Sequence, residues 1–238
     1  MSSRRVIVSA RAIAALLPFV SKAATRYYLN GIHIEPANPE FDGVLLVATD
    51  GTRMGIVHDL LGETDGAHNL SIPPLLKRML GRGAANAARA ARAHFVDDAA
   101  HLVTTDFPDT GNVSIPSEHH LFTGYAPDIE GQFPNWRRIL NFADKREHDG
   151  AAIAINPTFL ADFVYAAATL RTSRFAPPSI RMYAPKADEA ALITAEHAVD
   201  GLSFVGLLMP QRDNFSGDGK IQPAWLAPAE DSSETKAA

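Results

Sequence analysis

The chain contains no cysteine among its 238 residues. Disulfide bridges, thiolate metal ligands and thiol catalysis are therefore excluded, and the absence of cysteine fits a reducing compartment. No apolar run is long enough to span a bilayer. The basic and then apolar start at residues 1–8 is too short for a signal peptide. The sequence thus predicts a cytoplasmic protein with no membrane partner.

Recognisable catalytic and metal-binding patterns are also missing. The nine histidines include no H-x-x-x-H or H-E-x-x-H pair, and the adjacent His119 and His120 would point to opposite faces of a strand. Gly81 and Gly83 lack the strand–loop–helix setting of a phosphate-binding loop. Asp50 precedes a glycine, which favours a turn residue over a catalytic acid. We therefore expect a non-catalytic protein without cofactor or metal, and an enzyme that uses His and Asp residues is the weaker alternative.

Acidic residues are scarce in two stretches of an otherwise mildly acidic chain, whose net charge is −5. That net charge alone argues against a general nucleic-acid binder. Residues 68–94, however, contain five Lys or Arg and no Asp or Glu, and the first acid of the chain is Glu35. The acids gather in loops and near the C-terminus. Two interpretations remain open: a basic helical surface that attracts phosphates, or an ordinary solvated helix face.

Three segments share one pattern: a short apolar strand, a capping residue or proline, and an apolar stripe at helical spacing. They predict helices over residues 10–24, 75–80 and 158–170, preceded by strands at 6–9, 70–72 and 153–155. Pro18 should kink or end the first helix. Further strand-like runs follow each helix, at 28–35, 44–49, 53–57, 93–96, 101–105, 112–115, 120–125, 179–184, 191–195 and 204–209.

The repeated strand–helix–strands unit predicts an α+β fold. A single amphipathic helix per unit would bury its apolar stripe on one face of an antiparallel sheet. Its opposite face would then meet solvent or a ligand.

Five strings of residues resemble one known family. The strings RYYLNG at 26–31 and ATDGTRM at 48–54 are similar, in sequence and separation, to the second domain of the bacterial DNA polymerase III beta subunit, the sliding clamp. The resemblance extends to SIPPLLKRML at 71–80, GQFPNWRRIL at 131–140 and GLLMPQR at 206–212. It implies a DNA-clamp fold: a clamp domain of two units at 1–130, a connector with a partial clamp domain at 131–212, and a disordered tail at 213–238.

The resemblance also implies two sites. A hydrophobic pocket for peptides of the polymerase and the clamp loader would use Leu29, Thr49, Gly51, Thr52, Arg53, Met54, Leu207, Leu208, Met209 and Pro210. Aliphatic and Met side chains suit such an adaptable apolar floor, although 207–209 could equally be a terminal core strand. Duplex DNA would be contacted by Arg11, Lys22, Arg26, Tyr27, Tyr28, Lys77, Arg78, Arg82 and Arg171.

The implied function is that of a polymerase processivity factor, a non-catalytic subunit of a DNA polymerase, which self-associates into a ring around DNA. The sequence departs from the family at Thr52, where His is common, and at Asn141, where Pro is common. If a ring needs twelve units, four chains of three units would close it, or three chains if 112–146 holds a degenerate fourth unit. The alternative is a clamp-like interaction protein that binds polymerase or clamp-loader partners without encircling DNA.

Overall fold

The computed structural model describes residues 4–81, 86–103, 117–140, 154–171, 179–183, 189–196 and 201–211. The expected strand at 112–115, the expected tail at 213–238 and the basic residue Arg82 lie outside the described residues. Of the stretch proposed to hold a fourth unit, 112–146, residues 117–140 are described and the two ends are not.

The described residues form five α-helices, and the first and the last of them begin at side-chain caps that the sequence supplies. They are α1 (Ala10–Leu16), α2 (Pro74–Leu80), α3 (Asn86–Ala90), α4 (Arg137–Leu140) and α5 (Pro157–Leu170). The Ser9 hydroxyl accepts a hydrogen bond from the Arg11 N–H at 3.2 Å, and the Asn156 side chain accepts one from the Thr158 N–H at 2.9 Å. The break expected at Pro18 is confirmed, because α1 ends at Leu16 and a 3-10 turn, η1 (Leu17–Phe19), follows. A further short turn, η3 (Ser117–His119), precedes the strand at 120.

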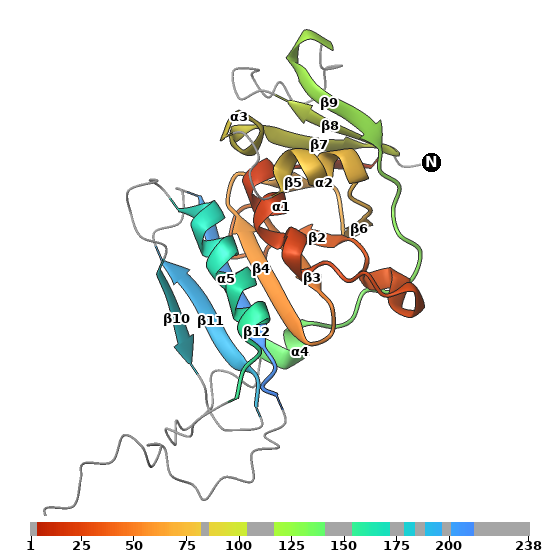
Figure 1. Cartoon of the computed structure of the whole chain (residues 1–238). Coiled ribbons are helices and arrows are strands. Elements are labelled where there is room, and N and C mark those ends of the chain that lie inside the picture. The colour runs from red at the N-terminus through yellow and green to blue at the C-terminus, as the bar shows by residue number, and fades with distance from the viewer. Residues whose placement is uncertain are drawn as a thin grey trace, which may run out of the picture.

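The strands form two antiparallel sheets (Figure 1). The first is five-stranded, in the order β5 (Glu63–Thr64), β1 (Arg5–Ser9), β7 (Arg92–Val96), β8 (Ala99–Val103), β9 (His120–Tyr125). The second is seven-stranded, in the order β10 (Ser179–Tyr183), β11 (Ala191–Glu196), β12 (Leu202–Leu208), β4 (Arg53–Asp59), β3 (Val44–Thr49), β2 (Ile32–Pro36), β6 (His68–Leu70). Mixed helices and antiparallel sheets confirm the predicted α+β fold.

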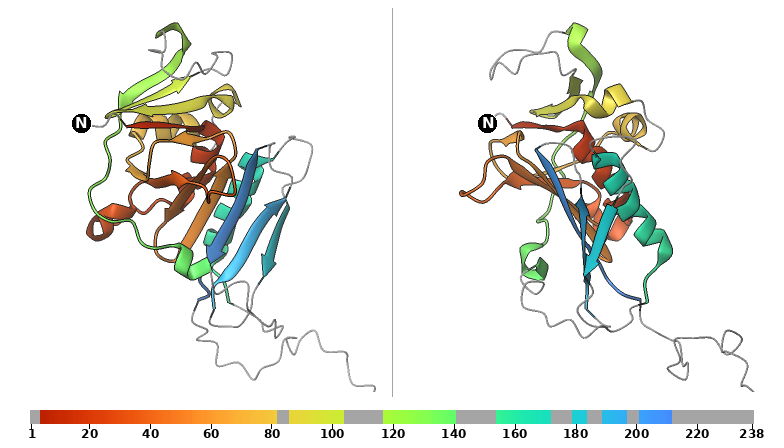
Figure 2. Two further views of the ribbon diagram at one scale, coloured as in Figure 1. Left: turned by 180° about the vertical axis from the view of Figure 1, so that it is seen from behind. Right: turned by 90° about the vertical axis from the view of Figure 1, so that its left-hand side faces the viewer.

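The first two units exchange their leading strands. Strand β1 opens the first unit but pairs with β7 of the second, and β6 opens the second unit but pairs with β2 of the first. The third unit consists of α5 and β10 to β12, and it joins the first through seven paired positions between β12 and β4. The right-hand view in Figure 2 shows the red, yellow and teal helices on one side of the strands. One side of the seven-stranded sheet, named here the helical face, is therefore covered by α1, η1 and α5.

The main core lies between the helices and the sheets, and three phenylalanines bring η1, α5 and β12 together. The rings of Phe19 and Phe163 meet edge to face with centroids 4.9 Å apart, and Phe204 lies within 6.3 Å of both. Gly206 allows this approach, because a Cβ there would lie 2.3 Å from the Phe163 ring. Helix α5 therefore packs directly on the strand that joins the third unit to the first.

Three predicted elements differ from those observed. At the strand expected over 153–155, the described residues Ala154 and Ile155 have no regular secondary structure. Residues 24–29 form a 3-10 turn, η2 (Ala24–Leu29), so the strand expected from residue 28 begins only at Ile32. The Tyr28 carbonyl accepts a hydrogen bond from the Asn69 side chain at 2.8 Å, which satisfies this backbone group outside a sheet. The strand expected at 70–72 is β6, shifted to His68–Leu70, because Pro73 and Pro74 begin α2 immediately afterwards. None of the described helices is long and apolar enough to cross a membrane.

Candidate functional site

The seven-stranded sheet has different environments on its two sides at the joint between β4 and β12. On the side away from the helices, a second apolar cluster forms, named here the outer cluster; it consists of Leu29, Val47, Met54, Ile56, Phe133, Trp136, Ala190 and Leu207. Successive side chains of a strand point to opposite faces. Met54 and Ile56 of β4 therefore reach the outer cluster, while Val57 belongs to the main core.

The turn between β3 and β4 is held by Asp50. Its Oδ1 atom accepts hydrogen bonds from the Thr52 N–H at 2.9 Å, the Thr52 hydroxyl at 2.7 Å and the Arg53 N–H at 3.1 Å. Burial by itself would raise the pKa of Asp50, but these hydrogen bonds and the Arg53 charge lower it below its ordinary value. Gly51 has a φ of +92°, which favours glycine. The turn that sequence reasoning expected is thus present, with Asp50 in a structural role.

The expected peptide pocket is only partly assembled at this turn. The Met209 N–H donates to the Thr52 carbonyl at 3.0 Å, so the end of β12 lies against the turn. Met209 is 46% exposed, whereas Leu29, Met54 and Leu207 are buried in the outer cluster. Thr49, Gly51 and Thr52 belong to the turn, and Pro210 follows Met209 in the chain. The exposed part of the expected pocket is therefore Met209 with the turn.

Two residues expected in the pocket lie on the other side of the sheet. Leu208 is fully buried in the main core, because its side chain points to the opposite face of the sheet from those of Leu207 and Met209. Arg53 also points toward the helices. The structure therefore separates Leu208 and Arg53 from the other residues of the expected pocket.

Aromatic side chains that sequence reasoning did not assign to a site cover the outer cluster. Phe133 stacks on His33 with ring centroids 4.6 Å apart, and Trp136 lies beneath the Arg137 guanidinium at 4.4 Å. Beside Trp136 is a hollow of about 370 Å³, lined by Ala37, Asn38, Phe41, Leu45, His58, Trp136, Arg137 and Leu140. The sequence contained one signal for this aromatic cover: Phe133 and Trp136 are three residues apart in the string FPNW at 133–136.

On the helical face, Arg53 ties the turn to α5. Its Nε donates to Asp50 at 3.1 Å, its Nη2 donates to the Pro18 carbonyl at 3.0 Å, and its Nη1 pairs with Asp162 of α5. The guanidinium also lies over the Phe159 ring at 4.4 Å. Because the side chain is only 12% exposed, Arg53 acts as a structural cross-link between the turn, η1 and α5.

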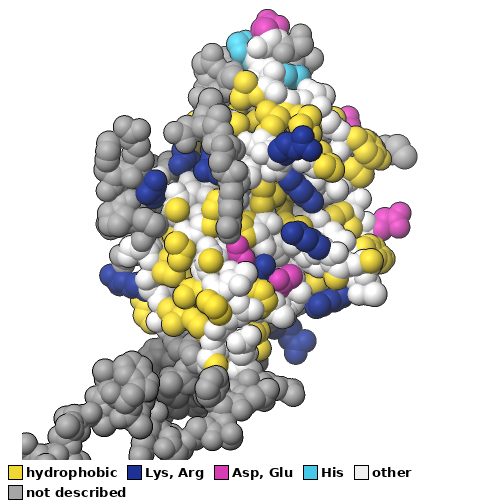
Figure 3. Space-filling view, viewed as in Figure 1, with side chains coloured by type: hydrophobic (Ala, Val, Ile, Leu, Met, Phe, Trp, Pro, Cys, Tyr) yellow, Lys and Arg dark blue, Asp and Glu magenta, His cyan; other side chains and the backbone are white. Residues whose placement is uncertain are grey.

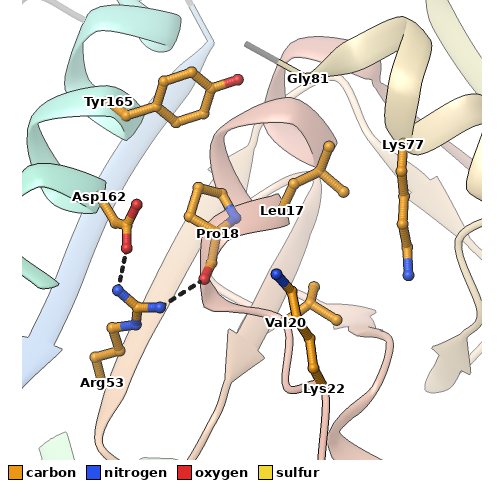
Figure 4. A pocket seen from close by; sticks show the side chains of 9 residues that line it. All are labelled: Leu17, Pro18, Val20, Lys22, Arg53, Lys77, Gly81, Asp162 and Tyr165. Carbon is orange, nitrogen blue, oxygen red and sulfur yellow. Dashed lines mark hydrogen bonds and ion pairs between the residues drawn. The ribbon is translucent and has the colours of Figure 1, made fainter. Parts of the chain in front are cut away.

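A second hollow of about 370 Å³ opens on the helical face beside Arg53 (Figure 4). Lys22, from the segment after η1, and Lys77, from α2, both line it, and within the described residues neither forms an ion pair. Burial and then the charge of Lys22 lower the pKa of Lys77. Two positive charges therefore share this hollow, while the charge of Arg53 is balanced by Asp50 and Asp162. This arrangement suits a phosphate group or another anion.

The other residues expected at DNA are distributed over several elements. Arg11 is half-buried and donates to the Thr169 carbonyl at 3.0 Å, which ties α1 to α5. Arg26, Tyr27 and Tyr28 lie in η2 rather than in a strand. Arg78 is exposed on α2, Arg171 is half-buried after α5, and Arg82 is outside the described residues. Figure 3 shows dark blue side chains spread over the helical face, with fewer magenta ones.

The described histidines lie outside any metal-like cluster. The rings of His101 and His120 are 4.8 Å apart on β8 and β9, and burial followed by the charge of His120 lowers the pKa of His101. Among the described residues, no group of three or more His, Asp or Glu side chains could hold a metal ion.

No model of a known protein family matches the sequence, and no curated protein matches it. Solved structures do. The beta clamp of H. pylori, in complex with diflunisal, has a TM-score of 0.57 and 12% identity over 89% of this chain and 67% of its own. The beta chain of DNA polymerase III from Streptococcus pneumoniae has a TM-score of 0.54 and 14% identity over 89% and 65%. The DNA polymerase beta subunit of Streptococcus pyogenes has a TM-score of 0.53 and 14% identity over 87% and 65%.

These similarities define the fold as that of a DNA sliding clamp. At 12–14% identity they concern the fold alone. The chain spans 65–67% of the length of these clamp structures.

Proposed function

We propose that the chain is a non-catalytic, clamp-like processivity factor. Its helical face contacts duplex DNA, and its outer face holds short peptides of a DNA polymerase and a clamp loader. The main supporting observation is that the two faces of the sheet differ in character where β4 pairs with β12. Two lysines without an ion pair among the described residues lie on its helical side, while Met209 and an apolar cluster lie on the other.

Contacts between lysine and phosphate suit this role because they carry no sequence information. The acid that lines the hollow of Lys22 and Lys77, Asp162, is paired with Arg53, so a phosphate oxygen there would relieve the mutual repulsion of the two lysines. The remaining exposed cation of α2, Arg78, extends the same positive region. A protein that binds in this way can move along a duplex of any sequence.

Reversing both charges, as Lys22→Glu with Lys77→Glu, should weaken binding of duplex DNA about tenfold or more at low salt. The slope of log affinity against log salt should fall by roughly two, because each phosphate contact contributes about 0.9 to it. Fluorescence anisotropy of a labelled duplex across a salt series measures both quantities.

The matched control is Arg138→Glu with Arg137→Glu. It makes the same change in net charge on α4, which packs beside the outer cluster. This control should leave the salt slope unchanged. Equal losses in the two double variants would show that total charge, rather than the helical face, governs DNA binding.

Peptide binding is proposed for the junction of Met209 with the turn at 49–52. A partly exposed Met beside an apolar cluster offers a flexible surface to aliphatic and aromatic side chains. Phe133 and Trp136 complete the cluster below it. This proposal keeps the residues of the expected pocket that share the outer face.

Met209→Ala should weaken binding of a clamp-binding peptide from a polymerase about fivefold or more without lowering the urea midpoint of unfolding. Leu208→Ala is the matched comparison, since it truncates the adjacent, fully buried side chain. It should cost about 2–5 kcal/mol of stability. Peptide titrations by calorimetry and urea unfolding together separate the two effects, and unchanged peptide affinity in Met209→Ala would refute this pocket.

Self-association around DNA is the remaining part of the proposal. A second candidate, a clamp-like interaction protein that binds partners without closing a ring, is favoured by the limited span of the chain along known clamps. Light scattering in solution discriminates the two. A trimer or tetramer supports a ring, and a monomer at micromolar concentration favours the second candidate.

A further inference from the structure

The hollow beside Trp136 is a second concave site on the outer face, apart from the peptide junction. Trp136 belongs to the outer cluster, and Leu45 and Leu140 pack against it. Phe41 also lines the hollow, although its side chain is 62% exposed. The loop that carries this ring is held in place, because the Phe41 N–H donates to the Asn38 carbonyl at 2.8 Å. A large exposed aromatic ring beside an apolar hollow indicates a docking site.

The charged groups at this hollow are mainly cationic. The described residues that line it include Arg137 and no Asp or Glu. Arg137 pairs with Glu35, whereas the next residue of α4, Arg138, is exposed and forms no ion pair in the part of the chain that the structure describes. The hollow and its surroundings therefore suit an apolar group that is followed by acidic residues.

Such a sequence is present in this chain, in the segment 212–238 that lies outside the described residues. The string PAWLAP at 223–228 contains the adjacent apolar residues Trp225 and Leu226, and acids follow it at 230, 231 and 234. Each of the two prolines favours extended backbone at the residue before it. A segment that already favours one conformation loses less conformational entropy when it docks.

The length of this segment is sufficient for the tryptophan to reach the hollow. Strand β12 ends at Leu208, which pairs with Arg53 beside the turn. His58 lines the hollow and is five residues farther along β4, which corresponds to about 17 Å at the usual rise of a strand. The thirteen residues 212–224 span up to about 43 Å. Trp225 of the same copy therefore reaches the hollow, and a flexible connection of this kind gives it an effective concentration of about millimolar.

We propose that Trp225 docks in the hollow of its own copy, so that the segment before it lies across the outer face and shields the peptide junction at Met209. The segment leaves the described chain two residues after Met209, so its path along this face to the hollow passes the junction. The acids at 230 and 231 then lie near Arg137 and Arg138. Docking would order part of the tail that was expected to be disordered. The proposal rests on the peptide site of the proposed function and adds its regulation, since a partner peptide competes with the chain's own segment.

Fluorine NMR of the full chain labelled with fluorotryptophan tests the docking. The chain has two tryptophans, so Trp225→Ala identifies the signal of Trp225. We expect this signal to be displaced from that of free fluorotryptophan and to be as broad as that of the buried Trp136, at every protein concentration. Phe41→Ala should move it to the free position. Leu61→Ala is the matched control, because Leu61 is 67% exposed but does not line the hollow, and it should leave the signal unchanged.

Peptide titrations test the shielding. Trp225→Ala should tighten binding of a clamp-binding peptide from a polymerase about fivefold, the factor expected if the segment is docked about 80% of the time. Phe215→Ala truncates another aromatic residue of the same segment and should leave the affinity unchanged.

Three results would overturn the proposal: a Trp225 signal at the free position, a signal that is displaced only at high protein concentration, or equal peptide affinities of the wild type and Trp225→Ala. If neither protein bound the peptide, the peptide site of the proposed function would be refuted instead. A displaced Trp225 signal that moves in Phe41→Ala would then still support docking in the hollow.

Discussion

Phe163→Ala should lower the free energy of unfolding by about 3–5 kcal/mol, the range typical of a large aromatic side chain removed from a core. Phe163 is fully buried, contacts Phe19 and Phe204, and fills the space that Gly206 leaves open. Its loss would leave a cavity where α5, η1 and β12 meet. Urea unfolding followed by circular dichroism measures the change, and a large fraction of a typical domain's total stability would disappear.

Val164→Ala is the control for this variant. The residue is adjacent on α5 but 41% exposed, so its truncation should change stability by no more than about 0.5 kcal/mol. Similar losses of stability in the two variants would contradict the packing of Phe163 in the core. They would mean that truncating an exposed side chain of α5 destabilises the protein as much as truncating a buried one.

Asp162→Ala should lower stability by about 3 kcal/mol, because removal of one partner leaves the other charge of a buried pair poorly compensated. Asp162 and Arg53 are each 12% exposed at their side chains, and Arg53 keeps Asp50 and the Pro18 carbonyl as partners. These remaining contacts keep the expected loss at the lower end of the usual range. Thermal and urea unfolding at constant ionic strength measure it.

A double-mutant cycle with Arg53→Met isolates this pair. If the ion pair is the cause, Asp162→Ala should cost much less in the Arg53→Met background, with a coupling energy above about 1 kcal/mol. Additive losses would mean that Asp162 stabilises α5 by other contacts.

The fold was largely predictable because its signals are local. The stripes at 75–80 and 158–170 and the breaking effect of Pro18 depend on backbone chemistry and apolar spacing alone, and α1, α2 and α5 follow them. The turn η2 was not predictable in this way, because its residues RYYL have strand-like composition. A long-range hydrogen bond from Asn69 to the Tyr28 carbonyl, invisible in local sequence, helps to hold that segment outside the sheet.

The site was predictable only in part, since resemblance identifies positions but not the direction of each side chain. Strand alternation over 204–209 could have assigned Leu208 to the core and Leu207 with Met209 to the other face. The direction of Arg53 could not be read in this way, because it depends on Asp162, which is 109 residues away in sequence. Lys22 and Lys77 likewise meet only through the packing of η1 beside α2.

The exchange of leading strands between the first two units has a consequence for the order of folding. Strand β1 pairs with β7, which lies about ninety residues later in the sequence, and β2 pairs with β6, which follows β3, β4 and β5. Such non-local pairing slows folding, because the entropy of closing long loops is lost before the contacts form. During synthesis, β1 cannot pair with β7 until residue 96 has left the ribosome, and β2 cannot pair with β6 until residue 70 has. We therefore expect the N-terminal strand to stay unpaired through much of translation, and the two units to fold together rather than one after the other.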